Sequence, residues 1–274
     1  MKFSIIIGTL NRHKELQECI NCLLQQTYRA FEIIIVDQSQ EDFSQITDFD
    51  KDLIKYIRID KKGLSHARNV AISMATGDYI CLVDDDGLYD PNVLEVADKI
   101  IDEIHPVILG GKMIDPVSGI CRTNEGESII NWNSSFKYLV SPTMIIETEF
   151  LKIHNFDERF GVGSTYGSGE ETDIVLAALK VRKLVYYCDR YIVRHHVEVN
   201  GISDVDRVVS YSYGRGALLK KTVKEYSALW GIILYMRSYW YNALSGFFTI
   251  RNKNRRNLKL KKASSIRKGF KSFR

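Results

Sequence analysis

The chain has 274 residues, of which 45% are hydrophobic and 26% are charged, a composition typical of a soluble globular protein with a sizeable core. Its five cysteines do not suit a disulfide framework and indicate a reducing cytosol, and no apolar stretch is long enough to favour a membrane-spanning helix. The net charge of +4 is unevenly placed, because residues 251–274 hold 11 Lys or Arg and no acid, which leaves −7, the difference between +4 and +11, on residues 1–250.

Apolar runs of strand length alternate with segments of helical periodicity through the first half of the chain. Helices are predicted between the first two strands to about residue 28, over residues 64–75, and from Asp90-Pro91, where Asp90 suits the N-cap and Pro91 the first turn. This β-α-β-α order predicts a mostly parallel sheet with helices on both faces. Strands are predicted at residues 4–10, 32–37, 55–59, 79–85, 107–114 and 143–147.

Three of the predicted strands end in polar residues, although the strands themselves are apolar. The ends are Thr9-Leu10-Asn11, Asp37-Gln38-Ser39 and Asp84-Asp85-Asp86. In open α/β sheets ligands bind at the carboxyl ends of the strands. We therefore expect these residues to share one crevice.

The second half of the chain is less regular. Residues 115–200 contain the glycine-rich segment FDERFGVGSTYGSGEETD, followed by a helix face that includes Ile174 and Ala178. A helix is predicted at about 204–222, followed by an aromatic segment at 228–250 and the basic segment at 251–274.

The segment VDDDG raises the question of what offsets three adjacent negative charges at a strand end. An EF-hand calcium loop with Gly87 at its sixth position is excluded, because Leu82 and Val93 would then stand where carboxylates are required. A solvated acidic turn is one alternative. The favoured interpretation is a D-x-D site, in which Asp84 and Asp86 face a divalent cation and a nucleotide diphosphate.

Five segments carry a family resemblance through their order along the chain. They are SIIIGTLNR, EIIIVDQS, GLSHARNVAISMATGDYICLVDDD, FDERFG and GSGEETD. Over about residues 3–200 the chain resembles a family 2 glycosyltransferase. The resemblance implies a GT-A type, Rossmann-like, mostly parallel α/β sheet flanked by helices. It implies a catalytic domain at 1–200, with a nucleotide-binding half at about 1–114 and an acceptor half at about 115–200, and a helical, amphipathic and basic extension at 201–274.

The same resemblance implies a donor site at the strand ends. A carboxylate that accepts the N3–H of a pyrimidine would favour uridine, and a guanidinium group can bind phosphate in bidentate fashion. Loop capping is the alternative for the strand-end residues, and an exposed helix position is the alternative for Arg68. The implied donor-binding residues are Thr9, Asn11, Arg12, Asp37, Arg68, Asp84 and Asp85.

A divalent metal, Mn²⁺ or Mg²⁺, is implied as cofactor, with Asp86 as its principal ligand. Related enzymes often place a histidine near His195 as a further metal or phosphate contact. Because neighbouring residues of a strand point to opposite faces, at most one of His195 and His196 should enter the site. A structural histidine is the alternative.

A second acidic cluster, Glu170-Glu171-Thr172-Asp173, lies far along the chain from the first. Transfer of a sugar to a hydroxyl group needs a carboxylate that removes the acceptor proton. The family usually has Glu-Asp at the position of Glu170-Glu171, so this chain departs from the pattern at Glu171, to which we assign the base. Glu170 and Asp173 are expected at the acceptor or as a secondary acidic site. The alternative is that these acids only favour a helix N-terminus.

The predicted function is that of an inverting glycosyltransferase that moves a sugar from a nucleotide diphosphate, expected to be a UDP-sugar, to a saccharide or lipid-linked acceptor in bacterial surface polysaccharide or glycolipid assembly. A sugar-phosphate nucleotidyltransferase is the first alternative, but its usual Gly-rich basic loop is missing from SIIIGTLNRHKEL. A catalytically inactive nucleotide-binding module is the second.

The C-terminal segments predict a contact with an anionic partner. Residues 228–250 are rich in aromatic and aliphatic side chains but are interrupted by Arg237, which with the basic segment suits an interfacial helix on an anionic membrane. This places the protein in the cytoplasm, peripherally at the inner face of the cell membrane. The alternatives are packing on the catalytic domain or on a second copy of the chain, and nucleic-acid binding is disfavoured because no reader motif accompanies the segment.

Overall fold

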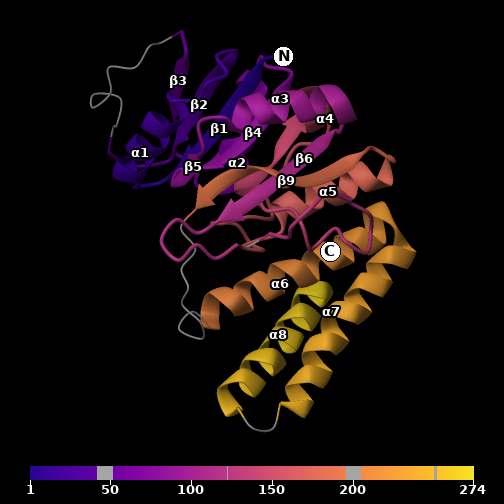
Figure 1. Ribbon diagram of the computed structural model, residues 1–274. Coiled ribbons are helices and arrows are strands. Elements are labelled where there is room, and N and C mark those ends of the chain that lie inside the picture. Colours follow the sequence, from indigo (N-terminus) through magenta and orange to yellow (C-terminus); the bar gives the residue numbers. More distant parts are fainter. Residues whose placement is uncertain (42–51, 122, 196–204, 250–251) are drawn as a thin grey trace.

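The computed structural model describes residues 1–41, 52–121, 123–195, 205–249 and 252–274 (Figure 1). Within these residues one nine-stranded sheet has the order β3-β2-β1-β4-β8-β6-β9-β5, and β7 pairs with β9. The strands are β1 (Phe3–Thr9), β2 (Phe31–Asp37), β3 (Ile54–Arg58), β4 (Tyr79–Asp84), β5 (Gly87–Tyr89), β6 (Ile108–Ile114), β7 (Ser128–Ile129), β8 (Ile145–Glu147) and β9 (Val185–His195). The predicted α/β sheet is confirmed.

Helices α1 to α5 pack on the sheet, and helices α6 to α8 lie beside it (Figure 1). The helices are α1 (His13–Leu23), α2 (Leu64–Met74), α3 (Val93–Ile104), α4 (Thr148–Ile153), α5 (Glu170–Lys180), α6 (Val205–Lys221), α7 (Ala228–Phe248) and α8 (Lys253–Ser272). A 3-10 turn spans Ser141–Thr143 and a π-helical turn spans Thr222–Tyr226.

Strands β1, β2 and β4 pair in parallel and are buried on both sides. Along β1, Ile5 and Ile7 face the core layer formed with α1 and α3, whereas Ile6 faces the layer formed with α2, α4 and α5. A strand that is covered on both faces needs apolar residues at every position, which explains the run SIII. Strands β5, β7 and β8 pair antiparallel with their neighbours, so the complete sheet is mixed.

The strand register brings the three predicted polar ends together. Gly8 of β1 is opposite Asp84 of β4, and Thr9 is opposite Asp37 of β2. The three ends are therefore adjacent, as a shared crevice requires.

The start of α3 differs from the sequence-based prediction. The helix begins at Val93 with Asn92 at the N-cap, two residues later than an Asp90 cap would require. Asp90 instead accepts two hydrogen bonds from the guanidinium group of Arg194, at 2.7 and 3.1 Å. An ion pair between β9 and the turn after β5 thus takes the carboxylate that was expected to cap the helix.

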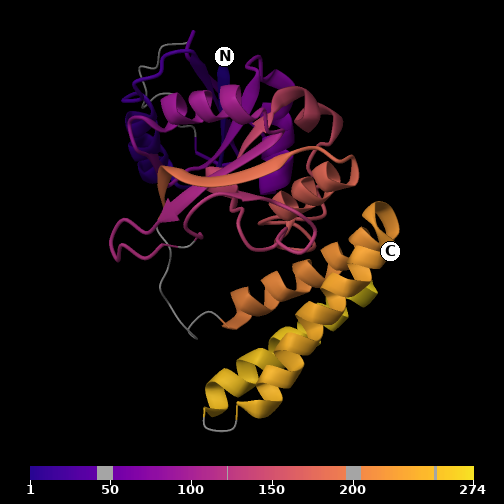
Figure 2. The same cartoon turned by 45° about the vertical axis from the view of Figure 1, so that its right-hand side comes forward.

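Helices α6, α7 and α8 form a separate helical layer beside the sheet (Figures 1 and 2). Ala217 and Leu218 of α6 pack against Phe160, in the loop before α5, and Leu176 of α5. The basic α8 packs on α6 through close backbone approach: a Cβ on Gly269 would lie 1.9 Å from the carbonyl oxygen of Tyr213. The basic segment is therefore a packed helix.

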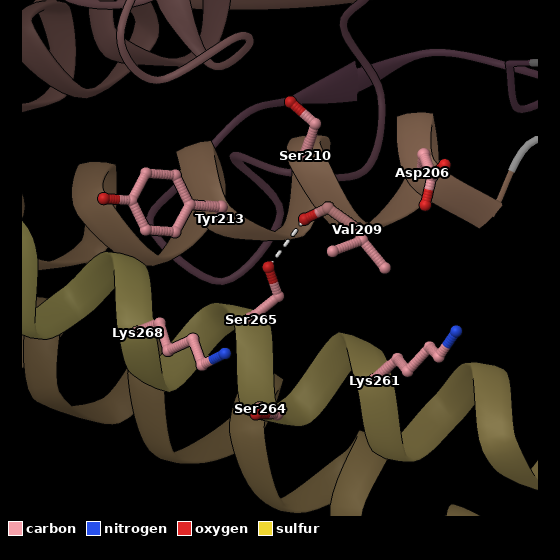
Figure 3. A pocket seen from close by; sticks show the side chains of 8 residues that line it. All are labelled: Asp206, Val209, Ser210, Tyr213, Lys261, Ser264, Ser265 and Lys268. Atoms are coloured by element: carbon pink, nitrogen blue, oxygen red, sulfur yellow. Dashed lines mark hydrogen bonds between the residues drawn. The ribbon is translucent and has the colours of Figure 1, made fainter.

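A cavity of about 510 Å³ remains between α6 and α8, with Lys261 and Lys268 on its α8 side (Figure 3). Ser265 closes its floor by donating a hydrogen bond to the carbonyl oxygen of Val209 at 2.6 Å. We call this the α6–α8 cavity.

Helix α7 carries large apolar side chains that are open to solvent. They recur at helical spacing and make one continuous surface, which we call the α7 apolar stripe. Its members are Leu229, Ile232, Ile233, Met236, Trp240, Tyr241, Leu244, Phe247 and Phe248. In the part of the chain that the structure describes, none of the helices has the length and apolar character needed to cross a membrane.

Candidate active site

A cavity of about 840 Å³ opens at the carboxyl ends of β1 and β4. Parts of its lining come from the end of β4 and the turn after it, from the loop before α2 and from the glycine-rich loop. The lining residues are Gly8, Thr9, Leu10, Arg12, Gln38, Lys62, Gly63, Leu64, Asp84, Asp85, Asp86, Val162, Gly163, His195 and Arg207. Six predicted donor-site or metal-site positions therefore line one cavity: Thr9, Arg12, His195 and the aspartates at 84–86.

Cations from three elements offset the charge of the aspartate triplet. Arg12 reaches Asp85 at 2.8 Å and Asp86 at 2.7 Å. His195 Nε2 lies 3.0 Å from Asp86 Oδ1 and 3.5 Å from Asp84 Oδ2, and Arg68 reaches the other oxygen of Asp84 at 3.0 Å. The repulsion that the sequence posed is thus balanced within the protein itself.

The balance is unequal among the three carboxylates. Burial acts to raise the pKa of Asp86, but His195 and Arg12 hold it well below its ordinary value. Burial and the two neighbouring aspartates outweigh Thr9 and Arg12 at Asp85, and its pKa rises to about 6. Asp85 is only 5% exposed, and it accepts a hydrogen bond from Thr9 at 2.8 Å. Asp86 is therefore the more readily ionised of these two.

His195 enters the site through strand pairing. The antiparallel pair β5–β9 places His195 opposite Gly87, directly after the aspartates. Burial lowers the pKa of His195, but interaction with Asp84 and Asp86 outweighs it and raises the pKa to about 10. His196, the other candidate, lies outside the described residues.

The residues around Asp86 suit a divalent cation. Asp86 Oδ1 and His195 Nδ1 are buried and lack a hydrogen-bond partner of suitable geometry among the described residues. Carboxylate and imidazole are ligands for Mn²⁺ and Mg²⁺-type sites that are completed by substrate phosphates. Across the described residues no cluster of three or more His, Cys, Asp or Glu side chains has metal-binding geometry, so oxygens of a substrate would have to complete the coordination.

Arg68 connects the two acidic clusters of the sequence. It lies on α2 and is only 2% exposed. One terminal nitrogen contacts Asp84 at 3.0 Å and Ser141, and the other contacts Glu170 at 3.4 Å. Its guanidinium group also lies over the ring of Phe156. Arg68 does not line the cavity, and its contacts suit the positioning of carboxylates, so its role in donor binding stays a prediction.

Glu170 and Glu171 form the first turn of α5. Glu170 is buried, whereas Glu171 is half-buried beside it. Burial and the negative charge of Glu170 raise the pKa of Glu171 above its ordinary value. A carboxylate with a raised pKa is a stronger base, which is the property that proton removal from a hydroxyl group requires.

Two predicted nucleotide-binding residues, Asp37 and Asn11, make hydrogen bonds that hold the turns after β2 and β1. Asp37 is fully buried and accepts hydrogen bonds from Tyr56 at 2.6 Å and from the backbone N–H of Ser39 at 2.8 Å. Asn11 has φ of 56° and donates its backbone N–H to Ser39 Oγ at 2.7 Å. Neither lines the cavity, although both hold the turns that do.

Asp173 points away from Glu170 and Glu171. It is 2% exposed, and it accepts hydrogen bonds from Lys221 at 2.7 Å and from Tyr226 at 2.8 Å. Lys221 also donates to Asp157 at 2.8 Å. The structure does not bring Asp173 to the cavity; it fastens α5 to the C-terminal helices instead.

Several cavity residues were missed by sequence reasoning. Lys62, Val162, Gly163 and Arg207 come from two loops and from the first turn of α6. The glycines of FGVGS were a usable signal, since Gly161 and Gly163 have positive φ and Gly161 leaves no room for a Cβ beside Ser65. No local pattern indicated Arg207.

A sheet of this topology, with a D-x-D group at its strand ends and a second acidic pair joined to it by an arginine, is typical of the GT-A fold. Residues 4–153, more than half of the chain, match the family described as Glycosyl transferase family 2. The chain belongs to this family.

Curated relatives include two bacterial glycosyltransferases. Poly(ribitol-phosphate) beta-N-acetylglucosaminyltransferase TarS of Staphylococcus aureus is 31% identical over 165 residues, which cover 56% of this chain and 28% of TarS. Glycosyltransferase GlyG of Streptococcus pneumoniae is 34% identical over 105 residues, which cover 36% of this chain and 35% of GlyG. The chain thus spans about a third or less of these relatives' length.

Solved structures share the fold at lower identity. Residues 1–349 of S. aureus TarS superpose with a TM-score of 0.69 at 21% identity, covering 97% of this chain and 80% of that one. The mannosyltransferase PcManGT of Pyrobaculum calidifontis, solved with GDP-Man and Mn²⁺, gives 0.66 at 14% identity, covering 97% and 73%. At these identities the likeness establishes the fold alone.

Proposed function

We propose that this chain is an inverting glycosyltransferase that moves a sugar from a UDP-sugar to an acceptor hydroxyl during assembly of a surface polysaccharide or glycolipid. The observation that carries the proposal is that one buried guanidinium group, Arg68, holds Asp84 at the cavity and Glu170 beside Glu171. Glycosyl transfer needs a site for the leaving diphosphate and a base for the acceptor, and this arrangement supplies both at a fixed separation.

The residues divide the work as follows. Arg12, Asp84 and Asp85 orient the donor nucleotide, with Thr9 fixing Asp85. Asp86 and His195 would hold Mn²⁺ or Mg²⁺, which as a Lewis acid supplies charge stabilisation for the leaving diphosphate. Glu171 takes the proton of the acceptor hydroxyl as that oxygen attacks the anomeric carbon. A single displacement inverts the configuration at that carbon.

A UDP-sugar is the favoured donor because structural relatives bind one. TarS residues 1–349 have been solved with UDP and with UDP-GlcNAc. The proposed division of labour along the chain places the donor at about residues 1–114, the acceptor at about 115–200, and attachment functions at 201–274.

A donor panel tests this function. Hydrolysis and transfer are expected with one UDP-sugar, with loss of activity when EDTA removes the metal, and NMR of the first product from an α-linked donor should show a β-glycoside. Formation of a nucleotide sugar from a sugar phosphate and a nucleoside triphosphate would instead identify a nucleotidyltransferase. Absence of turnover with every donor, despite UDP binding, would identify an inactive binding module.

We also propose that the protein sits peripherally on the inner face of the cell membrane, where a lipid-linked acceptor would be found. The α7 apolar stripe supplies a surface for acyl chains, and α8 beside it supplies basic residues for anionic headgroups. An amphipathic helix in the plane of the interface binds through the sum of these two terms.

The double variant Trp240→Ser/Phe247→Ser should bind anionic vesicles about 10–100-fold more weakly, because two exposed aromatic side chains lose their burial in lipid. Vesicle sedimentation measures this. Wild-type protein should be released only partly from the vesicles at 1 M salt. The Debye screening length is then about 3 Å, which weakens the attraction between basic residues and anionic headgroups but not the burial of apolar side chains in lipid.

The control is Val117→Ser/Ile153→Ser, which removes two apolar side chains outside α7 that are 83% and 75% exposed. Equal sedimentation of both variants and wild type would refute membrane binding through α7. If the wild-type protein is dimeric in solution and the α7 variant is monomeric, the α7 apolar stripe is the contact with a second copy of the chain.

A further inference from the structure

Four cationic side chains gather where α6, α7 and α8 meet the loop after β7. Arg215 comes from α6, Arg237 from α7, and Lys259 and Lys262 from α8. The guanidinium group of Arg215 lies 4.4 Å from the ring centroid of Phe136, and Arg237 donates a hydrogen bond to the carbonyl oxygen of Asn133 at 3.0 Å. We call this group the cationic cluster.

The cationic cluster lacks a counter-charge in the described part of the chain. Burial and then the charge of Arg237 lower the pKa of Arg215 to about 10, and no carboxylate counteracts them. Burial, followed by Arg215 and Lys259, likewise lowers the pKa of Lys262. Arg215 Nε is buried and has no hydrogen-bond partner among the described residues.

Such an arrangement costs stability, since like charges are brought together and partly removed from water. Every other buried cation described above has an acid beside it: Arg68 has Asp84 and Glu170, and Lys221 has Asp157 and Asp173. The cationic cluster therefore has the charge and the open donors that an anionic group would complete.

Its position indicates where that anion comes from. Lys259 Nζ lies 5.4 Å from the ring centroid of Tyr241, a member of the α7 apolar stripe that is 67% exposed. Arg237 lies in the sequence between Met236 and Trp240, two further members of the stripe. The cationic groups of Lys259 and Arg237 thus lie next to the α7 apolar stripe. In a phospholipid the phosphate group likewise lies next to the acyl chains.

We propose that the cationic cluster is a binding site for the phosphate group of a membrane lipid, whose acyl chains lie along the α7 apolar stripe. This inference rests on the proposed membrane association and adds to it a specific site. Arg215 and Arg237 would hold phosphate oxygens through paired N–H donors, and Lys259 and Lys262 would neutralise the remaining charge.

The test titrates short-chain phosphatidic acid, below its micellar concentration, into the full-length protein by calorimetry. Saturable one-site binding is expected for wild type. Lys259→Gln/Lys262→Gln should bind at least about tenfold more weakly, because two charge-assisted contacts to phosphate are lost. The matched variant Lys261→Gln/Lys268→Gln removes the same charge from the same helix at the α6–α8 cavity, and its affinity should stay within about threefold of wild type.

A second variant guards against misfolding. Arg237→Gln is exposed at the stripe and should weaken binding in a protein that melts like wild type. Equal losses in the cluster variant and the matched variant would overturn the site, because only overall charge would then matter. Inorganic phosphate that binds as tightly as the lipid would overturn the lipid source, and short-chain diacylglycerol binding equally well would overturn the need for phosphate.

Donor hydrolysis separates this inference from the proposed function. All three variants should hydrolyse the donor as wild type does, since none of their positions lines the donor cavity. Lipid binding without any donor turnover would retain the site and reject the transferase mechanism. Donor turnover without saturable lipid binding would reject the lipid site and retain the transferase mechanism.

Discussion

Replacing Asp86 by Ala is expected to abolish metal-dependent donor binding while the fold stays intact. Asp86 Oδ1 is buried 3.0 Å from His195 Nε2, and His195 and Arg12 hold the pKa of Asp86 well below its ordinary value despite burial. It is thus ionised and available as a ligand. Calorimetry with UDP and Mn²⁺ measures the loss, and far-UV circular dichroism monitors the fold.

The substitution also releases Arg12 and His195 from a carboxylate that both contact. Asp86→Asn keeps the size of the side chain and should lose Mn²⁺-dependent binding as well, which separates charge from packing. Asp102→Ala removes an exposed carboxylate from α3 and serves as the charge-matched control. Unchanged UDP and Mn²⁺ binding in folded Asp86→Ala would eliminate Asp86 as the metal ligand.

The parallel half of the fold was predictable because its signals are local. Buried strands need apolar residues throughout, and the runs in β1, β2 and β4 meet this condition. Polar residues directly after such runs must lie at the carboxyl edge of a parallel sheet, so the proximity of Thr9, Asp37 and Asp84 followed from the order of elements alone.

The remaining site features depend on contacts that are distant along the chain. His195 reaches Asp86 only because β9 pairs with β5, and Arg207 reaches the cavity only because α6 packs beneath the glycine-rich loop. Asp173 looked equivalent to Glu170 and Glu171 in the sequence. Each residue along a helix turns the side-chain direction by about 100°, so Asp173, two residues after Glu171, lies about 200° from it around α5 and contacts Lys221.

The C-terminal helices illustrate a third case. Excess positive charge was visible in residues 251–274, but its packing was not. Gly216 and Gly269 permit α6 and α8 to approach at backbone distance, since a Cβ on either would overlap the facing helix. These two glycines lie 53 positions apart, so no periodic pattern connects them. Charge composition indicated the type of partner, whereas the cationic cluster required the structure.

Replacing Glu171 by Gln is expected to leave donor binding unchanged and to lower the rate of sugar transfer by about 10²–10⁴-fold, the usual loss for a general base. Gln keeps the size and hydrogen-bonding capacity of the side chain but cannot accept a proton. Single-turnover kinetics with the donor identified by the panel measure transfer, and calorimetry with UDP and Mn²⁺ measures donor binding.

The pH dependence of the transfer rate is a second measurement, and altered packing at residue 171 would not by itself change its form. Burial and Glu170 raise the pKa of Glu171, so the base is protonated at pH values where an ordinary glutamate is ionised. Transfer by wild type should therefore increase as pH rises through this raised pKa, and the increase should disappear in Glu171→Gln. Glu170 is expected to act on that pKa, so that Glu170→Gln shifts the acidic limb of the profile to lower pH.

Glu171→Asp provides the matched control, because it restores the Glu-Asp pair usual in the family with a side chain one methylene shorter. It should retain at least about ten times the transfer rate of Glu171→Gln, since the carboxylate remains available as a base. Full turnover in Glu171→Gln, together with loss of turnover in Glu170→Gln, would move the catalytic role to Glu170. In that case Arg68, which contacts Glu170 at 3.4 Å, would hold the base directly instead of the residue beside it.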